Sequence, residues 1–200
     1  MPELLLFDLG GVLVEFAGPT ELGTHLRWPS SPALILDRWI QCPHTSAFER
    51  GDLTPEEWAD RFIVDWDVDL TREEFLAKFT TWSRRILPGA RELLDELRPR
   101  YRLAALSNSN ALHWERNAHE LGLLDLFEFA ISSHQVGVMK PDLAIYHHAV
   151  ARAAVSSPDA IMFFDDLEGN VQAARAVGLR ARQVRGVDQL REQLVRDELL

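Results

Sequence analysis

Three short apolar runs, each ending abruptly at polar residues, constrain the fold of this chain more than any other feature of its sequence. The runs are residues 4–7, 103–106 and 161–164, with a weaker run at residues 127–131. Continuous apolar runs of this length are typical of strands that are buried on both faces of a sheet. Helical patterns separate them, at residues 90–97, 111–121 and 171–177. This alternation predicts an α/β fold with a mostly parallel sheet flanked by helices.

The segment of residues 19–86 has a different pattern, with helix signals and no convincing strand. Two capping boxes start helices after Thr54 and Thr71, each with a glutamate three residues later. We therefore predict an all-helical insert over residues 19–86. The remaining residues, 1–18 and 87–200, are predicted to form the core domain that carries the sheet.

Aromatic residues in the insert recur at helical spacing. The regular positions are Trp58, Phe62, Trp66, Phe75, Phe79 and Trp82. Such stripes are interpreted as packing of the insert's own core. Trp28, Trp39 and Phe48 lie outside the stripes, and the sequence leaves open whether they face a substrate.

Charge and composition exclude several classes of function. The 200 residues carry a net charge of −10, which argues against a surface that grips nucleic acid or anionic lipid. No apolar stretch is long enough to span a bilayer, the first residues lack the features of a signal peptide, and the single cysteine, Cys42, has no partner for an internal disulfide. We expect a cytoplasmic protein, a monomer or homodimer, with no nucleic-acid or membrane partner.

Carboxylates follow two of the apolar runs directly. Asp8 ends the first run, and Asp165 and Asp166 end the third, at strand ends that meet at one edge of a parallel sheet. Three carboxylates this close do not all ionise without a cation, and hard oxygen ligands favour Mg²⁺. Taken alone, Asp8 before Gly10 and Gly11 also fits a tight turn, and the aspartate pair also fits a helix cap. The coincidence of these residues at one edge favours a metal site.

The second apolar run ends in hydroxyl and amide side chains. Ser107 and Asn108 precede a predicted helix, so their polar groups and backbone N–H groups suit a phosphate, although plain helix capping explains them equally well. Lys140 stands before Pro141, which is predicted to start a helix, so its backbone is extended and its ammonium group can reach back to the site. A negative site that accepts a negative substrate needs such a cation.

Four short motifs occur in a fixed order along the chain. They are Phe-Asp-Leu-Gly-Gly-Val-Leu at residues 7–13, Leu-Ser-Asn at 106–108, Val-Gly-Val-Met-Lys-Pro at 136–141, and Phe-Phe-Asp-Asp at 163–166, followed by Asn170 and Ala173-Ala174. Together they resemble the motifs of the haloacid dehalogenase-like hydrolase superfamily, over nearly the whole chain. Within it the pattern is most similar to bacterial phosphatases that act on glucose 1-phosphate, with the phosphatase domain of soluble epoxide hydrolase as a further relative. The resemblance implies a Rossmann-like core and makes the helical insert that family's cap domain.

The resemblance also implies a catalytic role for several matching residues. Asp8 would be the nucleophile, forming an aspartyl-phosphate that water hydrolyses. Mg²⁺ would be held by the Asp8 carboxylate, the backbone carbonyl of Gly10, and Asp165 or Asp166. The substrate would be a small phosphorylated metabolite.

The remaining matching residues would bind the phosphate. Ser107 and the N–H of Asn108 would hold phosphate oxygens, and Lys140 would offset negative charge on Asp8 and on the transferring group. Asn170 stands where many members of the family carry a further acidic residue.

Gly10 departs from the family pattern, because most family phosphatases carry there an aspartate that acts as general acid and base. Losing such help typically costs about 100- to 10,000-fold in rate, unless another residue substitutes, such as His44 or Glu49, or the leaving group is good. An anomeric oxygen leaves more readily than an ordinary alkoxide, which favours a sugar 1-phosphate as substrate.

Two alternatives to a Mg²⁺-dependent phosphatase stay open. In a 2-haloacid dehalogenase Asp8 would attack carbon and need no proton donor, but the bare pair Asp165 and Asp166 would repel the carboxylate of the substrate. In a phosphate-binding or regulatory protein, Gly10 would be the reason for little turnover.

Overall fold

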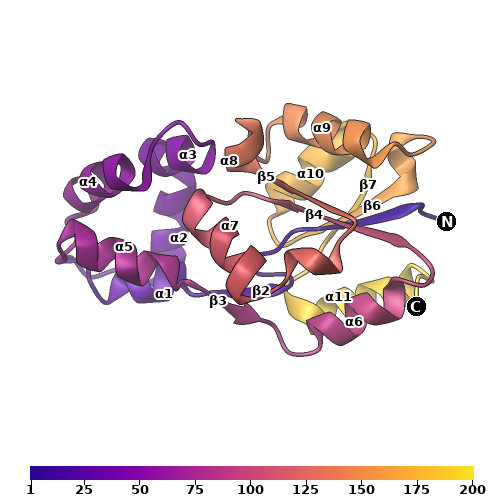
Figure 1. The fold of residues 1–200 in the computed structure, drawn as a ribbon, viewed down its shortest axis with the longest axis horizontal. Coiled ribbons are helices and arrows are strands. Elements are labelled where there is room, and N and C mark those ends of the chain that lie inside the picture. Colours follow the sequence, from indigo (N-terminus) through magenta and orange to yellow (C-terminus); the bar gives the residue numbers. More distant parts are fainter.

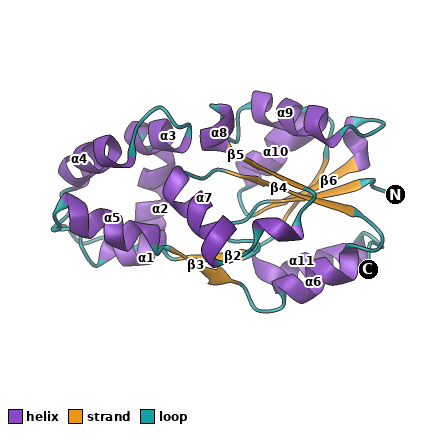
Figure 2. Ribbon diagram, viewed as in Figure 1, coloured by secondary structure: helices purple, strands orange, loops and turns teal.

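Five parallel strands form the central sheet of the computed structural model, which describes all 200 residues. The strands are β1 (Leu4–Phe7), β4 (Arg102–Ser107), β5 (Phe129–Ser132), β6 (Ile161–Asp165) and β7 (Arg180–Gln183). Their order across the sheet is β5-β4-β1-β6-β7, so the first strand of the chain lies at the centre (Figure 2). Leu5 of β1 lies between Leu103 of β4 and Met162 of β6. The predicted parallel sheet is confirmed.

Helices cover both faces of the sheet, which explains why its central strands are apolar throughout. On one face lie α6 (Ala90–Leu97) and α11 (Gly186–Arg196), and on the other lie α8 (Ser133–Val136), α9 (Leu143–Ala153) and α10 (Glu168–Ala176) (Figure 1). Leu5 and Phe7 pack in one apolar cluster, and Leu4 and Leu6 pack in a second. All four side chains are fully buried, and each such burial stabilises the fold by about 1.5–3 kcal/mol.

The helices that follow β2 pack around an apolar core of their own, beside the sheet (Figure 1). They are α1 (Gly18–Gly23), α2 (Pro32–Gln41), α3 (Pro43–Glu49), α4 (Pro55–Trp66) and α5 (Arg72–Thr80). Both predicted capping boxes are present. Thr54 Oγ1 accepts a hydrogen bond from the Glu57 N–H at 3.2 Å, and Glu57 accepts one from the Thr54 N–H at 3.0 Å, while Thr71 and Glu74 repeat the arrangement. We call these five helices the cap; the division of the chain at residues 19 and 86 stays a prediction.

The aromatic stripes fill the core of the cap, as the sequence predicts. All six members are buried: Trp58, Phe62, Trp66, Phe75, Phe79 and Trp82. The three aromatic residues that the sequence left open differ from one another. Phe48 is buried against Trp58, with ring centroids 4.5 Å apart, and the Trp28 indole donates to the Trp66 carbonyl. Only Trp39 reaches the wall of the cavity described below.

A two-stranded antiparallel ribbon lies between the cap and the sheet (Figure 2). It consists of β2 (Val14–Phe16) and β3 (Ser83–Ile86). The expectation that residues 19–86 contain no strand is therefore wrong at β3. The strand holds two exposed arginines, and Arg85 pairs with Glu15 of β2 at 2.7 Å. An edge ribbon of this kind has no apolar alternation by which a sequence pattern finds it.

Several predicted bounds also differ from the structure. The strand predicted over 127–131 begins at Phe129, because the Phe127 N–H closes a short turn on the Leu124 carbonyl. The helix predicted over 111–121 divides into α7 (Ala111–Glu115) and the π-helical turn η1 (Arg116–Glu120). The short turns η2 (Leu124–Leu126) and η3 (Pro158–Ala160) complete the elements. None of the helices combines the length and the apolar content that crossing a membrane requires.

Candidate active site

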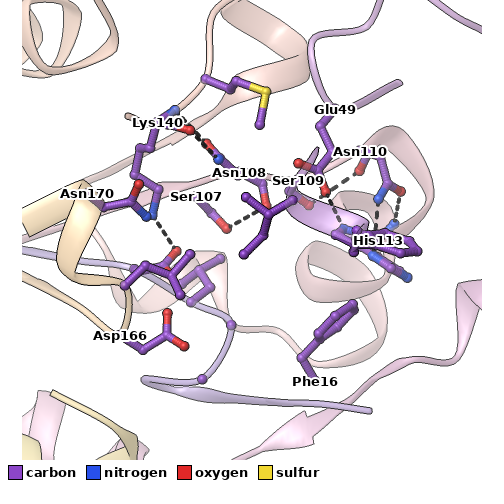
Figure 3. Close-up of a pocket in the computed structure, with 18 of the residues that line it drawn as sticks. Phe16, Glu49, Ser107, Asn108, Ser109, Asn110, His113, Lys140, Asp166 and Asn170 are labelled. Carbon is purple, nitrogen blue, oxygen red and sulfur yellow. Dashed lines mark hydrogen bonds and ion pairs between the residues drawn. The ribbon is translucent and has the colours of Figure 1, made fainter. Parts of the chain in front are cut away.

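The polar residues that end the strands meet at one edge of the sheet, beside the cap. Asp8 directly follows β1, and Ser107 and Asp165 are the last residues of β4 and β6. The Asp8 N–H donates to the Phe164 carbonyl at 2.9 Å, which continues the pairing of β1 with β6. A cavity of about 510 Å³ opens at this edge. Asp165 is fully buried and does not line this cavity. The other six predicted site residues do line it: Asp8, Gly10, Ser107, Asn108, Lys140 and Asp166. Figure 3 labels the last four of them.

Lys140 lies at the centre of this constellation and is 2 % exposed. Its Nζ contacts Asp8 Oδ1 at 2.8 Å and Asp165 Oδ2 at 2.6 Å, and donates to the Leu106 carbonyl at 3.0 Å. Burial alone lowers the pKa of a lysine, but the charges of Asp165 and Asp8 outweigh it and hold the pKa of Lys140 above its usual value. The ammonium group is therefore charged and has three partners.

The backbone of Lys140 is fixed by Asn108 rather than by a helix. Asn108 Oδ1 accepts from the Lys140 N–H and Nδ2 donates to the Lys140 carbonyl, both at 2.8 Å. The prediction that Pro141 starts a helix is wrong, because α9 begins at Leu143 and the Asp142 side chain caps it. Since the Asn108 side chain is committed to Lys140, its backbone N–H, which has no acceptor within the protein, is the group left for an anion.

The two aspartates at the end of β6 have different environments. Asp165 is fully buried, and its Oδ1 accepts from the Leu167 N–H and from Asn170 Nδ2, both at 2.9 Å, while its Oδ2 contacts Lys140. The carboxylate of Asp166 instead faces the cavity, where its hydrogen-bond donor is a backbone N–H rather than a side chain. Asp165 is thus held in place by its partners, whereas Asp166 is free to bind a ligand.

Three carboxylates share this small space with one cation. Oxygen atoms of Asp8, Asp165 and Asp166 lie within 4.8 Å of one another. Burial raises the pKa of Asp8 to about 7 against the effect of Lys140, and burial together with the charge of Asp165 raises the pKa of Asp166 to about 6. Lys140 offsets only one of the three negative charges. A hard divalent cation fits this oxygen-rich, electron-rich donor set, and Asp8 and Asp166 are the carboxylates that face it.

Gly10 and Gly11, which follow Asp8 and Leu9, differ in how much space a side chain would have. Gly11 has φ +75°, and a Cβ there would lie 2.7 Å from Asp166 Oδ2, so any side chain would displace that carboxylate. Gly10 has no such restriction, since the nearest atom to a Cβ, Phe16 Cβ, lies at 4.0 Å. Space therefore does not explain the absence of a side chain at position 10.

His113 of α7 also lines the cavity, although no sequence pattern indicated it. Its Nε2 donates to the Phe79 carbonyl at 2.7 Å, and its Nδ1 lies 3.2 Å from Asn110 Nδ2. Burial lowers the pKa of His113 to about 4, beyond the raising effect of the Phe79 carbonyl. His113 is therefore a neutral group that ties α7 to helix α5 of the cap, and a histidine inside a helical pattern carries no signal for this role.

Glu49, the last residue of α3, is the carboxylate that the cap contributes to the cavity. Trp39 Nε1 donates to its Oε1 at 3.4 Å, a long hydrogen bond. Burial raises the pKa of Glu49 to about 7, against the lowering effects of that N–H and of the Lys140 charge. His44, the other residue that the sequence suggested as a proton donor, does not line the cavity.

Comparison with known proteins shows which family the chain belongs to. Residues 2–178 match the family model of the haloacid dehalogenase-like hydrolases. The chain belongs to this family. Because the match covers most of the sequence, the predicted family and its Rossmann-like core are confirmed.

Individual relatives of this chain include several phosphatases. It is 37 % identical over 112 residues to phosphatase MT3486 of Mycobacterium tuberculosis, which covers 55 % of this chain and 51 % of that protein. It is 28 % identical over 191 residues to a phosphoglycolate phosphatase of Nitrosococcus oceani, covering 90 % and 82 % of the two chains. The chain spans about half the length of the first curated relatives that it matches.

A solved structure shares the fold. It is a haloacid dehalogenase family enzyme of Bacteroides thetaiotaomicron in complex with magnesium and inorganic phosphate, with a TM-score of 0.73 and 23 % identity, covering 92 % of this chain and 95 % of that one.

Proposed function

We propose that this hydrolase is a Mg²⁺-dependent phosphatase that releases inorganic phosphate from a small, singly phosphorylated metabolite. The observation that carries the proposal is the placement of Asp8, Lys140 and Asp166 around one cavity, with three carboxylates and one ammonium group. A dianionic phosphate enters such a site only with a further cation. The named phosphatases among its relatives support the same activity.

Asp8 is the proposed nucleophile. Its carboxylate lies at the cavity wall, and the Lys140 ammonium group at 2.8 Å orients it and offsets its charge. Attack on phosphorus forms an aspartyl-phosphate as the P–O bond to the alcohol breaks and the alcohol leaves, and water then hydrolyses the intermediate to phosphate and free Asp8. Ser107 and the Asn108 N–H are the proposed partners of the phosphate oxygens.

The proposed magnesium ligands are Asp8, the backbone carbonyl of Gly10, and Asp166. Asp165 is the less suitable of the two aspartates, because both of its oxygens already accept hydrogen bonds. When bound, Mg²⁺ neutralises phosphate charge and orients the group for in-line attack. A relative of this fold solved with magnesium and phosphate supports the assignment.

The charge of the cavity indicates the kind of leaving group. Lys140 is the one lysine or arginine in the cavity wall, and it is already paired with Asp8 and Asp165. A second phosphate or a carboxylate on the substrate would therefore meet no free positive charge. The volume of about 510 Å³ suits a small molecule with a neutral, hydroxylated body. We propose a sugar phosphate, and a sugar 1-phosphate above others because its anomeric oxygen leaves readily.

The proposal is tested by phosphate release from glucose 1-phosphate, glucose 6-phosphate, phosphoglycolate and fructose 1,6-bisphosphate, with Mg²⁺ and after chelation. We expect turnover that requires Mg²⁺, prefers the sugar monophosphates, and falls by more than about 10⁴-fold in Asp8→Asn. Absence of phosphate release from all four compounds with Mg²⁺ present would refute the phosphatase. Turnover of 2-chloropropionate instead would favour the dehalogenase, for which the three crowded carboxylates give no support.

A further inference from the structure

The cavity must supply a proton if a phosphate monoester with a poor leaving group is to be cleaved in it. The oxygen that leaves phosphorus takes up a proton, and the water that attacks the aspartyl-phosphate gives one up. This inference rests on the proposed function. Six titratable side chains line the cavity: Asp8, Glu49, His113, Lys140, Asp142 and Asp166.

Three of these six side chains already have another role in the proposed reaction. Asp8 is the proposed nucleophile, and Asp166 is the proposed metal ligand. Lys140 is charged and bound to two aspartates, so giving up its proton would leave both of them without a counter-charge. None of these three groups is available to transfer a proton to the leaving oxygen.

Two more are excluded by their hydrogen bonds. The ring nitrogens of His113 face the Phe79 carbonyl and the Asn110 amide, so neither points a free proton or lone pair at a substrate. Asp142 is exposed and caps α9 by accepting from the Ala144 N–H at 2.9 Å. Glu49 is the group that remains.

Glu49 enters the cavity from the cap, opposite the catalytic edge of the sheet. Figure 3 shows its side chain projecting from the cap ribbon toward the region of Ser109 and Asn110, with Asp166 on the far side of the view. The Trp39 indole N–H holds one of its oxygens. A substrate whose phosphate lies against Asp8 would extend its leaving group toward the cap, and so toward Glu49.

Gly51 lets the chain that carries Glu49 pass close to the core. Its φ is +79°, and a Cβ built on it would lie 2.5 Å from the carbonyl oxygen of His134 in the core. Helices α3 and α8 are in contact next to this point. The absence of a side chain thus allows the backbone after α3 to rest directly on the core, two residues from Glu49.

We propose that Glu49 is the general acid and base of this hydrolase, in place of a residue at position 10. As Asp8 forms its bond to phosphorus and the P–O bond to the alcohol breaks, the Glu49 carboxyl gives its proton to the departing oxygen. The resulting carboxylate then takes a proton from water, whose oxygen bonds to phosphorus while the bond to Asp8 breaks. Phosphate, free Asp8 and protonated Glu49 are regenerated, so protons and atoms balance.

The electrostatics of the cavity suit both steps. Burial raises the pKa of Glu49 to about 7, against the Trp39 N–H and the Lys140 charge, so both protonation states are populated near neutral pH. The other titratable groups that face the same cavity are Asp8, Asp142, Asp166 and neutral His113. With Glu49 as the donor, ordinary sugar alkoxides as well as anomeric oxygens become suitable leaving groups.

Glu49→Gln tests the proposal in two assays with Mg²⁺ present. For glucose 6-phosphate, which has a poor leaving group, we expect kcat/KM to fall about 100- to 10,000-fold. For p-nitrophenyl phosphate, whose phenolate leaves without a proton, we expect a rapid burst of one equivalent of nitrophenol followed by slow turnover. The burst arises because the aspartyl-phosphate forms normally and its hydrolysis lacks a base.

Glu56→Gln is the matched control, since it makes the same change on an exposed face of the cap outside the cavity. Glu49→Asp keeps the carboxyl group and should retain the pH dependence near pH 7 at a lower rate. Equal losses for both substrates without a burst would assign Glu49 to binding alone and overturn the proposal, as would wild-type turnover of glucose 6-phosphate by Glu49→Gln. A wild-type protein that hydrolyses neither of these substrates nor glucose 1-phosphate would instead refute the phosphatase itself.

Two further variants separate position from chemistry. Gly51→Ala leaves Glu49 intact but forces the chain away from His134, and should reproduce the burst of Glu49→Gln. Gly10→Asp, for which there is space, should restore part of the turnover of Glu49→Gln by supplying a second carboxyl group. Failure of both variants to behave in this way would contradict a proton-transfer role.

Discussion

The two walls of the cavity, one from the sheet and one from the cap, are held in shape by different interactions. On the sheet side, the buried polar groups are hydrogen-bonded: Asp165 has three donors, and Asn108 holds Lys140 by two bonds. On the cap side, the core is a stack of aromatic rings in which the indole N–H groups of Trp58 and Trp66 have no partner. Directional bonds fix the sheet side to one geometry, whereas the cap holds its shape by packing.

The difference assigns separate tasks to the two walls. Phosphoryl transfer is the same for every substrate, and its groups lie on strand ends that cannot shift without breaking the network around Lys140. The cap meets the variable part of a substrate, and there Glu49, Trp39, Ser46 and a few apolar side chains reach the cavity. We therefore expect substitutions on the sheet side to abolish the reaction, and those inside the cap, except at Glu49, to change stability or substrate choice.

The strongest test of this contrast is Lys140→Met. Removing one partner from a buried charge group leaves Asp8 and Asp165 uncompensated, which we expect to cost about 3–5 kcal/mol of unfolding free energy at pH 7. Urea unfolding measures the loss. Lys140→Met combined with Asp165→Asn should recover part of the lost unfolding free energy, since one of the two uncompensated carboxylates is then replaced by a neutral amide. A loss below about 1 kcal/mol would mean that the network does not fix the sheet side.

His113→Gln tests the link between the two walls, because His113 joins α7 to α5. The pKa of His113 is about 4 in the folded protein and 6.5 in an ordinary histidine. Between these values the unfolded chain binds a proton that the folded chain does not, so stability is lost as pH falls. As the pH falls from 7 to 5, the low pKa of His113 should lower the free energy of unfolding by roughly 2 kcal/mol.

Glutamine retains an N–H donor for the Phe79 carbonyl but does not titrate, so His113→Gln should show a shallower loss of stability between pH 7 and pH 5 than the wild type. Unfolding by urea at both pH values gives the comparison. If the two proteins have the same pH dependence, His113 is not a buried neutral group at this junction.

The smallest effect is expected in the capping boxes. Thr54→Ala and Thr71→Ala each remove a side-chain acceptor at the start of a cap helix and should cost about 1 kcal/mol. Because neither threonine lines the cavity, kcat/KM for glucose 6-phosphate should stay within twofold of wild type at a temperature where both variants are folded. A larger fall in activity would show that cap stability and the reaction are coupled.

Sequence patterns predicted the sheet side of the site more fully than the cap side. Asp8, Ser107 and Asp165 follow apolar runs, so their convergence is a consequence of parallel strands whose ends meet. The unequal environments of Asp165 and Asp166 depend on contacts with Asn170 and Lys140, which no local pattern contains.

Other features were missed because their signals are not local. Strand β7 is an edge strand in which Arg180 and Arg182 stay partly exposed, so it lacks an apolar run. His113 acquires its role only when α5 packs on α7. The closeness of Gly51 to His134 joins two segments that are far apart in the sequence.

The central position of β1 has a consequence for how the protein is made. Leu4 pairs with Arg102 on one side and Ile161 on the other, so β1 leaves the ribosome well before either of its partner strands, β4 and β6. The cap helices, with capping boxes and aromatic neighbours close in sequence, have their contacts much earlier. Long-range pairing is the slow kind of folding event. The order of synthesis thus allows the cap to fold before the sheet side. The sheet that positions Asp8 is completed only later.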